Sequence, residues 1–299
     1  MTVLLRHVMM QPKNLQMHKG GFTMKFKLDH DLHIHSLLTP CAGYDPRQTK
    51  EAILSYGIAS GLRLLSVADH VWDEKAPHSE ECNWSWEHIG CTLERGKSLL
   101  PLPQSPHCKF IFGAEVDMDL GGNLAVSAEE MEKLDFIVIA VSHLHLGDFT
   151  VPGDLDPSAE VHKELYLKRM HALLDMDLPW HKTGLAHPTC SLACAKEPVR
   201  MFDLITDAEY REMWTRVRDR GMGIEINHGG TISKEDLPHI LRPYQIAKEV
   251  GCKFYLGGDA HTPDDIPSIL PNWQRFVDWL DLQEEDKMPF VHEMLKKEN

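Results

Sequence analysis

Short apolar runs alternate with amphipathic segments along the chain from residue 24 onward. Seven of these runs are rich in Val, Ile, Leu and Phe and have the length of a strand, and their continuous hydrophobicity is typical of strands buried on both faces. They span residues 26–32, 62–68, 110–116, 136–141, 183–186, 223–226 and 254–257. Strands that alternate with helices predict a parallel sheet with the helices outside, in a protein of the α/β class.

Helix start and stop signals lie between these runs. Asp45 and Pro46 together predict a helix that starts there and ends at Gly57 or Gly61, because proline suits the first helical position. The other predicted helices begin at Ser127 or span residues 157–176, 207–220, 243–250 and 272–280. The alternation indicates a single (β/α) barrel domain that begins at Met24, after a loose N-terminal extension over residues 1–23.

Residues 71–108 interrupt the alternation of strands and helices. They follow the second predicted strand, on the side where barrels carry their active-site loops, so we expect them to form a partial lid. A packed helical insertion, stabilised by Trp72, Trp84 and Trp86, is an equally good interpretation of the same segment.

Composition narrows the classes of protein and partner. Of the 299 residues, 42% are hydrophobic and 25% are charged, which is typical of a soluble globular protein, and no apolar run is long enough to span a membrane. The net charge of -14 argues against long nucleic acid as a partner, although a small phosphorylated substrate is compatible with it. Seven cysteines without a framework-like spacing indicate reduced thiols and a cytoplasmic protein, whose oligomeric state stays open.

Residue types that bind metals follow nearly every predicted strand. Because the carboxyl ends of the strands of a parallel barrel meet on one face, we expect these side chains to converge there. Imidazoles bind Zn, Mn or Fe, and a carboxylate that bridges two cations supports activation of water to hydroxide. The strand-end segments are His33-Ile-His35, Asp69-His70, Glu115-Val-Asp117, His143-Leu-His145, His187-Pro188, Glu225-Ile-Asn227-His228 and Asp259-Ala-His261.

The motifs at these strand ends resemble those of a known family. In order along residues 24–270, they are DLHIHSLLTPCAG, LLSVADH, FGAEVD, AVSHLH, LAHP, IEIN and GGDAH. This set resembles the PHP family (polymerase and histidinol phosphatase). The resemblance implies a distorted seven-stranded TIM-like barrel and two or three divalent metal ions, Zn, Mn or Fe, at a site that hydrolyses phosphoesters.

The resemblance also implies which residues hold the metals. Its ligand groups are His33, His35, Glu115 and Asp259 for the first ion, Glu115, His143 and His187 for the second, and His70, His261 and Cys41 for the third. The place of Cys41 is often taken by a histidine or an acid in the family. Since a thiolate favours Zn or Fe over Mn, this departure bears on the identity of the third metal.

Other residues near the strand ends are expected to act around the metals. His145 shares a strand face with His143 and is expected to touch substrate. Asn227 and Glu225 are expected to contact substrate or to orient metal ligands. Asp69 is expected to bind a backbone group or to support a neighbouring metal-binding residue. The residues expected in the chemical step are Asp259, His143 and Glu115. The candidate phosphate-binding residues Arg169, Arg200 and Arg242 are each more typical of a surface charge.

The function predicted from these observations is metal-dependent hydrolysis of a phosphomonoester on a small metabolite, with histidinol phosphate as the first candidate. A phosphodiesterase acting on short nucleotides is one alternative. An amidohydrolase-type amide or lactone hydrolase is another, but such sites usually carry a lysine after a central strand, where this chain has His143. A non-catalytic metal-binding module is the third, and missing ligands would favour it.

Overall fold

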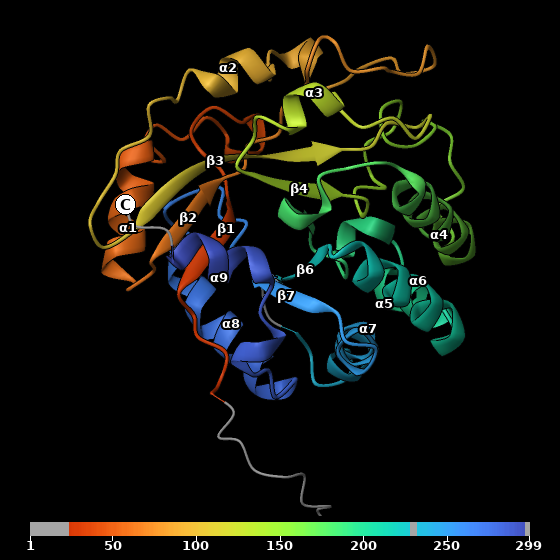
Figure 1. Cartoon of the computed structure of the whole chain (residues 1–299). Coiled ribbons are helices and arrows are strands. Elements are labelled where there is room, and N and C mark those ends of the chain that lie inside the picture. The colour runs from red at the N-terminus through yellow and green to blue at the C-terminus, as the bar shows by residue number, and fades with distance from the viewer. Residues whose placement is uncertain (1–23, 228–231, 297–299) are drawn as a thin grey trace, which may run out of the picture.

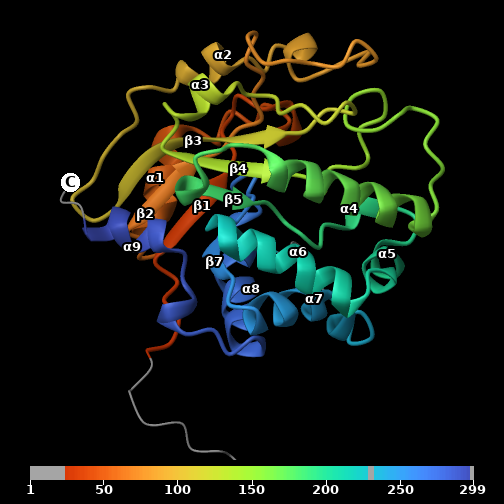
Figure 2. The ribbon, with the colours of Figure 1, turned by 45° about the vertical axis from the view of Figure 1, so that its right-hand side comes forward.

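The computed structural model describes residues 24–227 and 232–296, so the predictions for residues 1–23 and for His228 lie outside it. Seven parallel strands in sequence order form a nearly closed barrel with helices around it, which confirms the predicted fold class (Figures 1 and 2). The strands are β1 His30–Ile34, β2 Leu64–Val67, β3 Lys109–Asp117, β4 Phe136–Ala140, β5 Thr183–Leu185, β6 Gly223–Ile226 and β7 Lys253–Leu256.

The helices lie mainly between the strands in sequence and pack outside the sheet. Helix α6 coincides with the predicted span 207–220; it begins at a capping box formed by Thr206 and Glu209 and ends at Gly221, whose φ is 78°. None of the helices in the described ranges has the length and apolarity needed to cross a bilayer. The helices are α1 Lys50–Ala59, α2 Leu93–Lys97, α3 Ala128–Met131, α4 Ala159–Asp175, α5 Pro198–Leu204, α6 Asp207–Arg220, α7 Leu237–Glu249, α8 Ile266–Trp279 and α9 Pro289–Lys296.

Some predicted helix starts are wrong. Helix α1 is capped by Thr49, whose side chain accepts from the Ala52 N–H, because the Asp45 carboxylate is already bound to the backbone N–H of Arg47. Helices α7 and α8 begin at Leu237 and Ile266, ahead of the predicted starts at residues 243 and 272, and they contain Pro243 and Pro271. A proline removes one helical hydrogen bond, but the continuous buried faces of both helices outweigh this loss. Helices α5 and α9 were not predicted.

The barrel interior is filled by side chains. Alternate residues of β4, including Phe136 and Val138, belong to an inner cluster together with Phe290 and Val291 of α9, which closes one end of the barrel. The intervening Ile137 belongs to a larger cluster that includes residues of the surrounding helices. Since successive side chains of a strand point to opposite faces, this pattern separates an interior core from an outer one. The open end of the barrel is therefore the end where the strands finish.

The first and last strands close the barrel without a regular ladder. Near the closed end, the side chains of His30 and Asp31 on β1 accept backbone N–H groups of Leu256 and Gly258, at 3.0 and 2.9 Å. Near the open end, the two strands are joined by hydrogen bonds between backbone groups: the Asp259 N–H donates to the His33 carbonyl at 2.6 Å. We call this junction the β1–β7 seam. At its open end it reaches His33 and Asp259, two of the predicted metal ligands.

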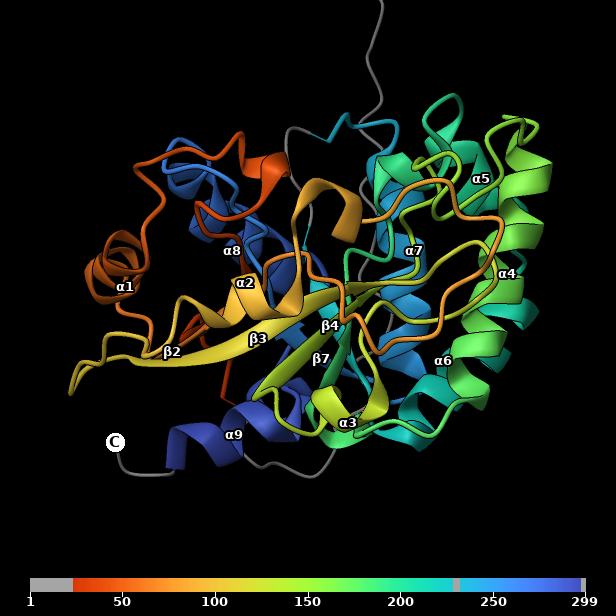
Figure 3. The same ribbon diagram turned by 90° about the horizontal axis from the view of Figure 1, so that it is seen from above.

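The segment 71–108 packs across the outside of β3 (Figure 3). It contains only one short α-helix, α2, and a 3-10 turn, Glu87–Ile89. The indole N–H of Trp84 donates to the Gly147 carbonyl at 2.7 Å, and Trp84 and Trp86 both contact the ring of Phe149. These contacts describe a packed insertion with little helix, and its opening as a lid stays a prediction.

Candidate metal centre

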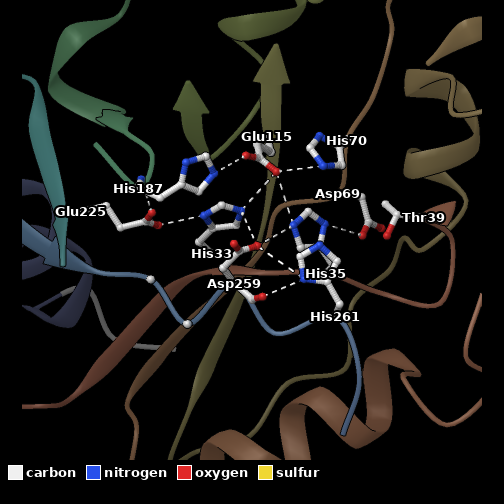
Figure 4. Close-up of polar contacts among 12 residues, drawn as sticks. His33, His35, Thr39, Asp69, His70, Glu115, His187, Glu225, Asp259 and His261 are labelled. Carbon is white, nitrogen blue, oxygen red and sulfur yellow. Dashed lines mark hydrogen bonds and ion pairs between the residues drawn. The ribbon is translucent and has the colours of Figure 1, made fainter. Parts of the chain in front are cut away.

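Glu115 of β3 lies at the centre of the histidine cluster and is 1% exposed. Its Oε2 atom lies 3.3 Å from Nε2 of His33, 3.3 Å from Nε2 of His35 and 3.2 Å from Nε2 of His70 (Figure 4). One carboxylate oxygen therefore faces ring nitrogens that come from β1 and from the end of β2.

The other oxygen of Glu115 faces a second pair of histidines. Oε1 lies 3.0 Å from Nε2 of His187, which follows β5, and 3.8 Å from Nε2 of His143, which follows β4. Glu115 is therefore positioned to bridge two groups of ligands.

The predicted ligands fall into compact groups. The ligand atoms of His33, His35, Glu115 and Asp259 all lie within 4.8 Å of one another. The same holds for Glu115, His143 and His187. These are the two groups that the motif resemblance implied for the first and second ions, and they share Glu115.

Cys41 lies beside these two groups, together with His35 and His261. Cys41 is exposed, and partial loss of water contact acts to raise the pKa of its thiol, but the positive charge of His35 and hydrogen bonds with His261 and His70 outweigh this effect and lower the pKa to about 4. A thiolate is the form that binds metals. The grouping differs from the expected one, because His35 takes the place of His70, whose Nε2 points toward Glu115.

Asp117 binds two of the imidazoles on the side that faces away from Glu115. Its carboxylate lies 3.0 Å from Nδ1 of His70 and 2.7 Å from Nδ1 of His143, and it accepts the indole N–H of Trp86. The Trp86 ring also stacks on His70, with 4.2 Å between centroids. In these contacts each Nδ1–H donates to the Asp117 carboxylate, which leaves Nε2 of each ring facing Glu115. Sequence reasoning gave Asp117 no role, although Asp117 and Glu115 share one face of β3.

Glu225 of β6 acts in the same way on the opposite side of the cluster. Its Oε1 lies 2.8 Å from Nδ1 of His33, and its Oε2 accepts the backbone N–H of His187 at 2.6 Å. A Cβ at Gly257 would lie only 1.8 Å from Glu225 Oε1, so glycine is required there. Glu225 thus contacts two ligand residues.

The remaining predicted site residues take different positions. His145 is exposed beside the ring of His143, whereas Asn227 is buried between two cavities. Asp69 accepts the backbone N–H of Ser36 at 2.6 Å, which orders the turn after His35.

The candidate phosphate-binding arginines have other partners. Arg200 and Arg242 form ion pairs with surface acids, as expected of surface charges. Arg169 does not fit that expectation, because it is 4% exposed and donates to the backbone carbonyls of Met118, Asp119 and Thr150. Burial lowers the pKa of its guanidinium to about 10. Arg169 therefore holds the loop after β3 in place.

Two ligand residues adopt a left-handed backbone that non-glycine residues rarely occupy. The φ angle is 51° at Asp259 and 21° at His187. Such strain persists where the surrounding structure enforces it, and it concentrates at functional sites. Here it turns both side chains toward Glu115.

The donor set fits divalent cations. Within the described residues, Nε2 of His33 and Nδ1 of His35 are buried without a hydrogen-bond partner, which is unfavourable unless another group binds them. Burial opposes a charge on His33, but Glu225 and Glu115 outweigh it and hold the pKa of this imidazole well above its usual value. Opposing charges likewise keep the pKa of Glu115 well below its usual value despite burial. Imidazole nitrogens and ionised carboxylates of this kind suit Zn, Mn or Fe.

Comparison with models of known families gives no match to this chain, and comparison with curated proteins gives none either. The fold and the buried cluster of histidines and acids are those of a barrel that is able to bind metal ions, which is compatible with a metal-dependent hydrolase.

Proposed function

We propose that this protein is a metal-dependent phosphatase of the PHP type, acting on a phosphomonoester of a small metabolite with two or three Zn, Mn or Fe ions. The observation that carries the proposal is the shared carboxylate of Glu115, which joins two compact ligand groups. A bridging carboxylate holds two cations at the spacing that phosphoester hydrolysis uses.

The residues around such a site would have different roles. Cations bound there would act as Lewis acids toward phosphoryl oxygens and would lower the pKa of a coordinated water. Glu225 and Asp117 orient the ligand imidazoles through Nδ1. The Asp259 carboxylate borders the three cavities around the centre, and nearby His33 and His35 lower its pKa despite burial. Asp259 is therefore ionised there, so it accepts a proton before it passes one on.

The overall reaction balances with water as the only co-reactant. The oxygen of water bonds to phosphorus, the bond between phosphorus and the ester oxygen breaks, and the alcohol oxygen takes up a proton. Since the site must pass that proton between water and alcohol, an ionised carboxylate at the border of the cavities suits the task.

The test combines metal analysis with a substrate panel. The purified full chain is analysed for bound metal and then assayed with phosphomonoesters, phosphodiesters and lactones in the presence of added Mn or Zn. We expect turnover of phosphomonoesters, and we expect Asp259→Ala and His33→Ala to reduce it by roughly a thousandfold or more, since each removes a ligand of a shared site.

A matched control is available for the histidine variant. His107 is exposed and lies on the loop before β3, so His107→Ala should retain full turnover and metal content. Near-normal activity in Asp259→Ala or His33→Ala, or turnover restricted to lactones or diesters, would contradict the proposal.

A further inference from the structure

A cavity of about 550 Å³ adjoins the candidate metal centre, and His187 and Asp259 form part of its lining. Helices α5 and α7, the segment after β5, and Asn227, Ile232 and Asp236 ahead of α7 supply the rest of the wall. That part is mainly apolar, with the side chains of Leu192, Val199, Phe202, Ile232 and Ile240. A volume of this size accommodates a small organic group next to the metals.

The charge of the cavity wall restricts that organic group. Among the described residues that line it there is no lysine or arginine, and Asp236 is its one acid besides the ligand Asp259. The whole chain carries a net charge of -14. A second anionic group on a ligand would therefore meet repulsion that no lysine or arginine of this wall offsets.

Asn227 supplies an unused donor at the same place. It directly follows β6, is 6% exposed, and lines both this cavity and a more polar one of about 540 Å³ beside His261. Its backbone carbonyl accepts the hydroxyl of Tyr244, but its Nδ2 has no hydrogen-bond partner among the described residues. A buried amide N–H without a partner is unfavourable, and an oxygen atom of a ligand would satisfy it.

Resting on the proposed phosphatase function, we infer that the substrate is the phosphomonoester of a largely apolar alcohol that carries no second anionic group. The hydrocarbon part of the alcohol occupies the cavity between α5 and α7, against Leu192. Asn227 Nδ2 donates to an oxygen of the ester.

The test compares three esters on the metal-loaded full chain. They are 2-phenylethyl phosphate, methyl phosphate and 2-phosphoglycolate, whose alcohol carries a carboxylate. We expect kcat/KM to be highest for the phenylethyl ester, by at least roughly tenfold over methyl phosphate, because the ring removes apolar surface from water. Calorimetric titration with 2-phenylethylphosphonate and methylphosphonate measures the same preference as a ratio of Kd values, without turnover.

Two variants separate the two parts of the inference. Leu192→Asn should lower the ratio of kcat/KM for 2-phenylethyl phosphate to that for methyl phosphate, since it makes the apolar wall more polar. Its matched control is Ile89→Asn on the insertion, because Ile89 and Leu192 are 43% and 42% exposed and only Leu192 lines the cavity. Asn227→Ala should lower kcat/KM for 2-phenylethyl phosphate and for methyl phosphate by a similar factor, roughly tenfold.

The outcomes distinguish this inference from the proposed function. Equal kcat/KM for all three esters, a preference for 2-phosphoglycolate, or no effect of Leu192→Asn would overturn the inference and leave the phosphatase function standing. Absence of all hydrolysis would overturn the function; phenylethylphosphonate binding that still depends on Leu192 would then support the cavity as the site of the apolar group. Absence of both hydrolysis and binding would overturn both.

Discussion

Cys41 is the residue at which this centre departs most from an all-histidine and carboxylate set. Its thiol lies with His35 and His261, and these neighbouring histidines together with His70 lower its pKa to about 4, so it is a thiolate at neutral pH. Soft thiolate ligands favour Zn or Fe, whereas Mn prefers oxygen and nitrogen donors. The preference of one metal position should therefore depend on this single side chain.

We predict that Cys41→His shifts the Mn to Zn ratio of the bound metal toward Mn by roughly tenfold, because an imidazole replaces the thiolate. The measurement is elemental analysis after dialysis against equal concentrations of both ions. Cys41→Ala serves as the control and should lose metal from that position without a gain in Mn. An unchanged ratio in Cys41→His would show that the thiolate does not bind metal.

The sequence predicted that these side chains meet, because the ends of all strands of a parallel barrel lie on one face; their binding of metal stays a prediction. His33, Glu115 and Asp259 had to reach the same mouth wherever the exact strand boundaries fell. The residues behind the ligands were harder to predict, because an acid that orients an imidazole and an acid that binds metal look alike in sequence. For this reason Asp117 is predicted at the strand ends without a role, and the prediction for Glu225 keeps two alternatives.

At the scale of elements, the insertion between β2 and β3 is joined to the metal centre. Trp86 stacks on His70 and donates its indole N–H to Asp117, which in turn holds His70 and His143. Nearby Trp84 donates to the Gly147 carbonyl and has no contact of this kind with Asp117. The insertion therefore acts on ligand geometry through one of its two neighbouring tryptophans.

We predict that Trp86→Phe weakens Zn or Mn binding by roughly tenfold, because Asp117 loses a hydrogen-bond donor and the imidazoles it orients become less fixed. Metal affinity is measured by competition with a chelator of known affinity. Trp84→Phe removes an indole N–H from the same segment and should leave the affinity unchanged. Equal effects of both substitutions would show that the insertion acts only through general packing.

Element boundaries failed where local signals competed with packing. Asp45 and Pro46 form a plausible helix start, but the Asp45 carboxylate binds the Arg47 N–H, and Thr49 caps α1 instead. Pro243 looks like a helix start and lies inside α7, because burial on either side of it continues the helix. Tertiary contacts of this kind cannot be derived from a local window of sequence.

At the scale of the whole molecule, the β1–β7 seam decides how the barrel closes. Asp31 lies in that seam, accepts the backbone N–H groups of His33 and Gly258, and also accepts the hydroxyl of Tyr56. Burial raises its pKa from 3.8 to about 7, although these hydrogen bonds act in the opposite direction. A carboxyl with a raised pKa stabilises the fold below its unfolded pKa, and this stabilisation is lost as the pH rises through the folded pKa.

We predict that Asp31→Asn makes the metal-free protein increasingly more stable than the natural sequence as the pH rises from about 4 to about 7, and that the difference levels off above that pH at up to about 4 kcal/mol. The amide avoids the buried charge and keeps an oxygen acceptor for the two N–H groups. Denaturant unfolding between acid and mildly alkaline pH measures the difference. Asp154→Asn changes an exposed acid and should show no such trend; a constant difference for Asp31→Asn across this range would contradict the prediction.

Trp86 stacks on His70 with 16° between the ring planes, so its fluorescence is sensitive to the state of this imidazole. Burial opposes a positive charge on His70, but Glu115 and Asp117 outweigh it and raise its pKa well above the usual value, so the ring is protonated before a cation arrives. Cation binding replaces that proton beside the indole. The fluorescence of this tryptophan should therefore change as the centre fills, which allows occupancy to be followed in solution without a label.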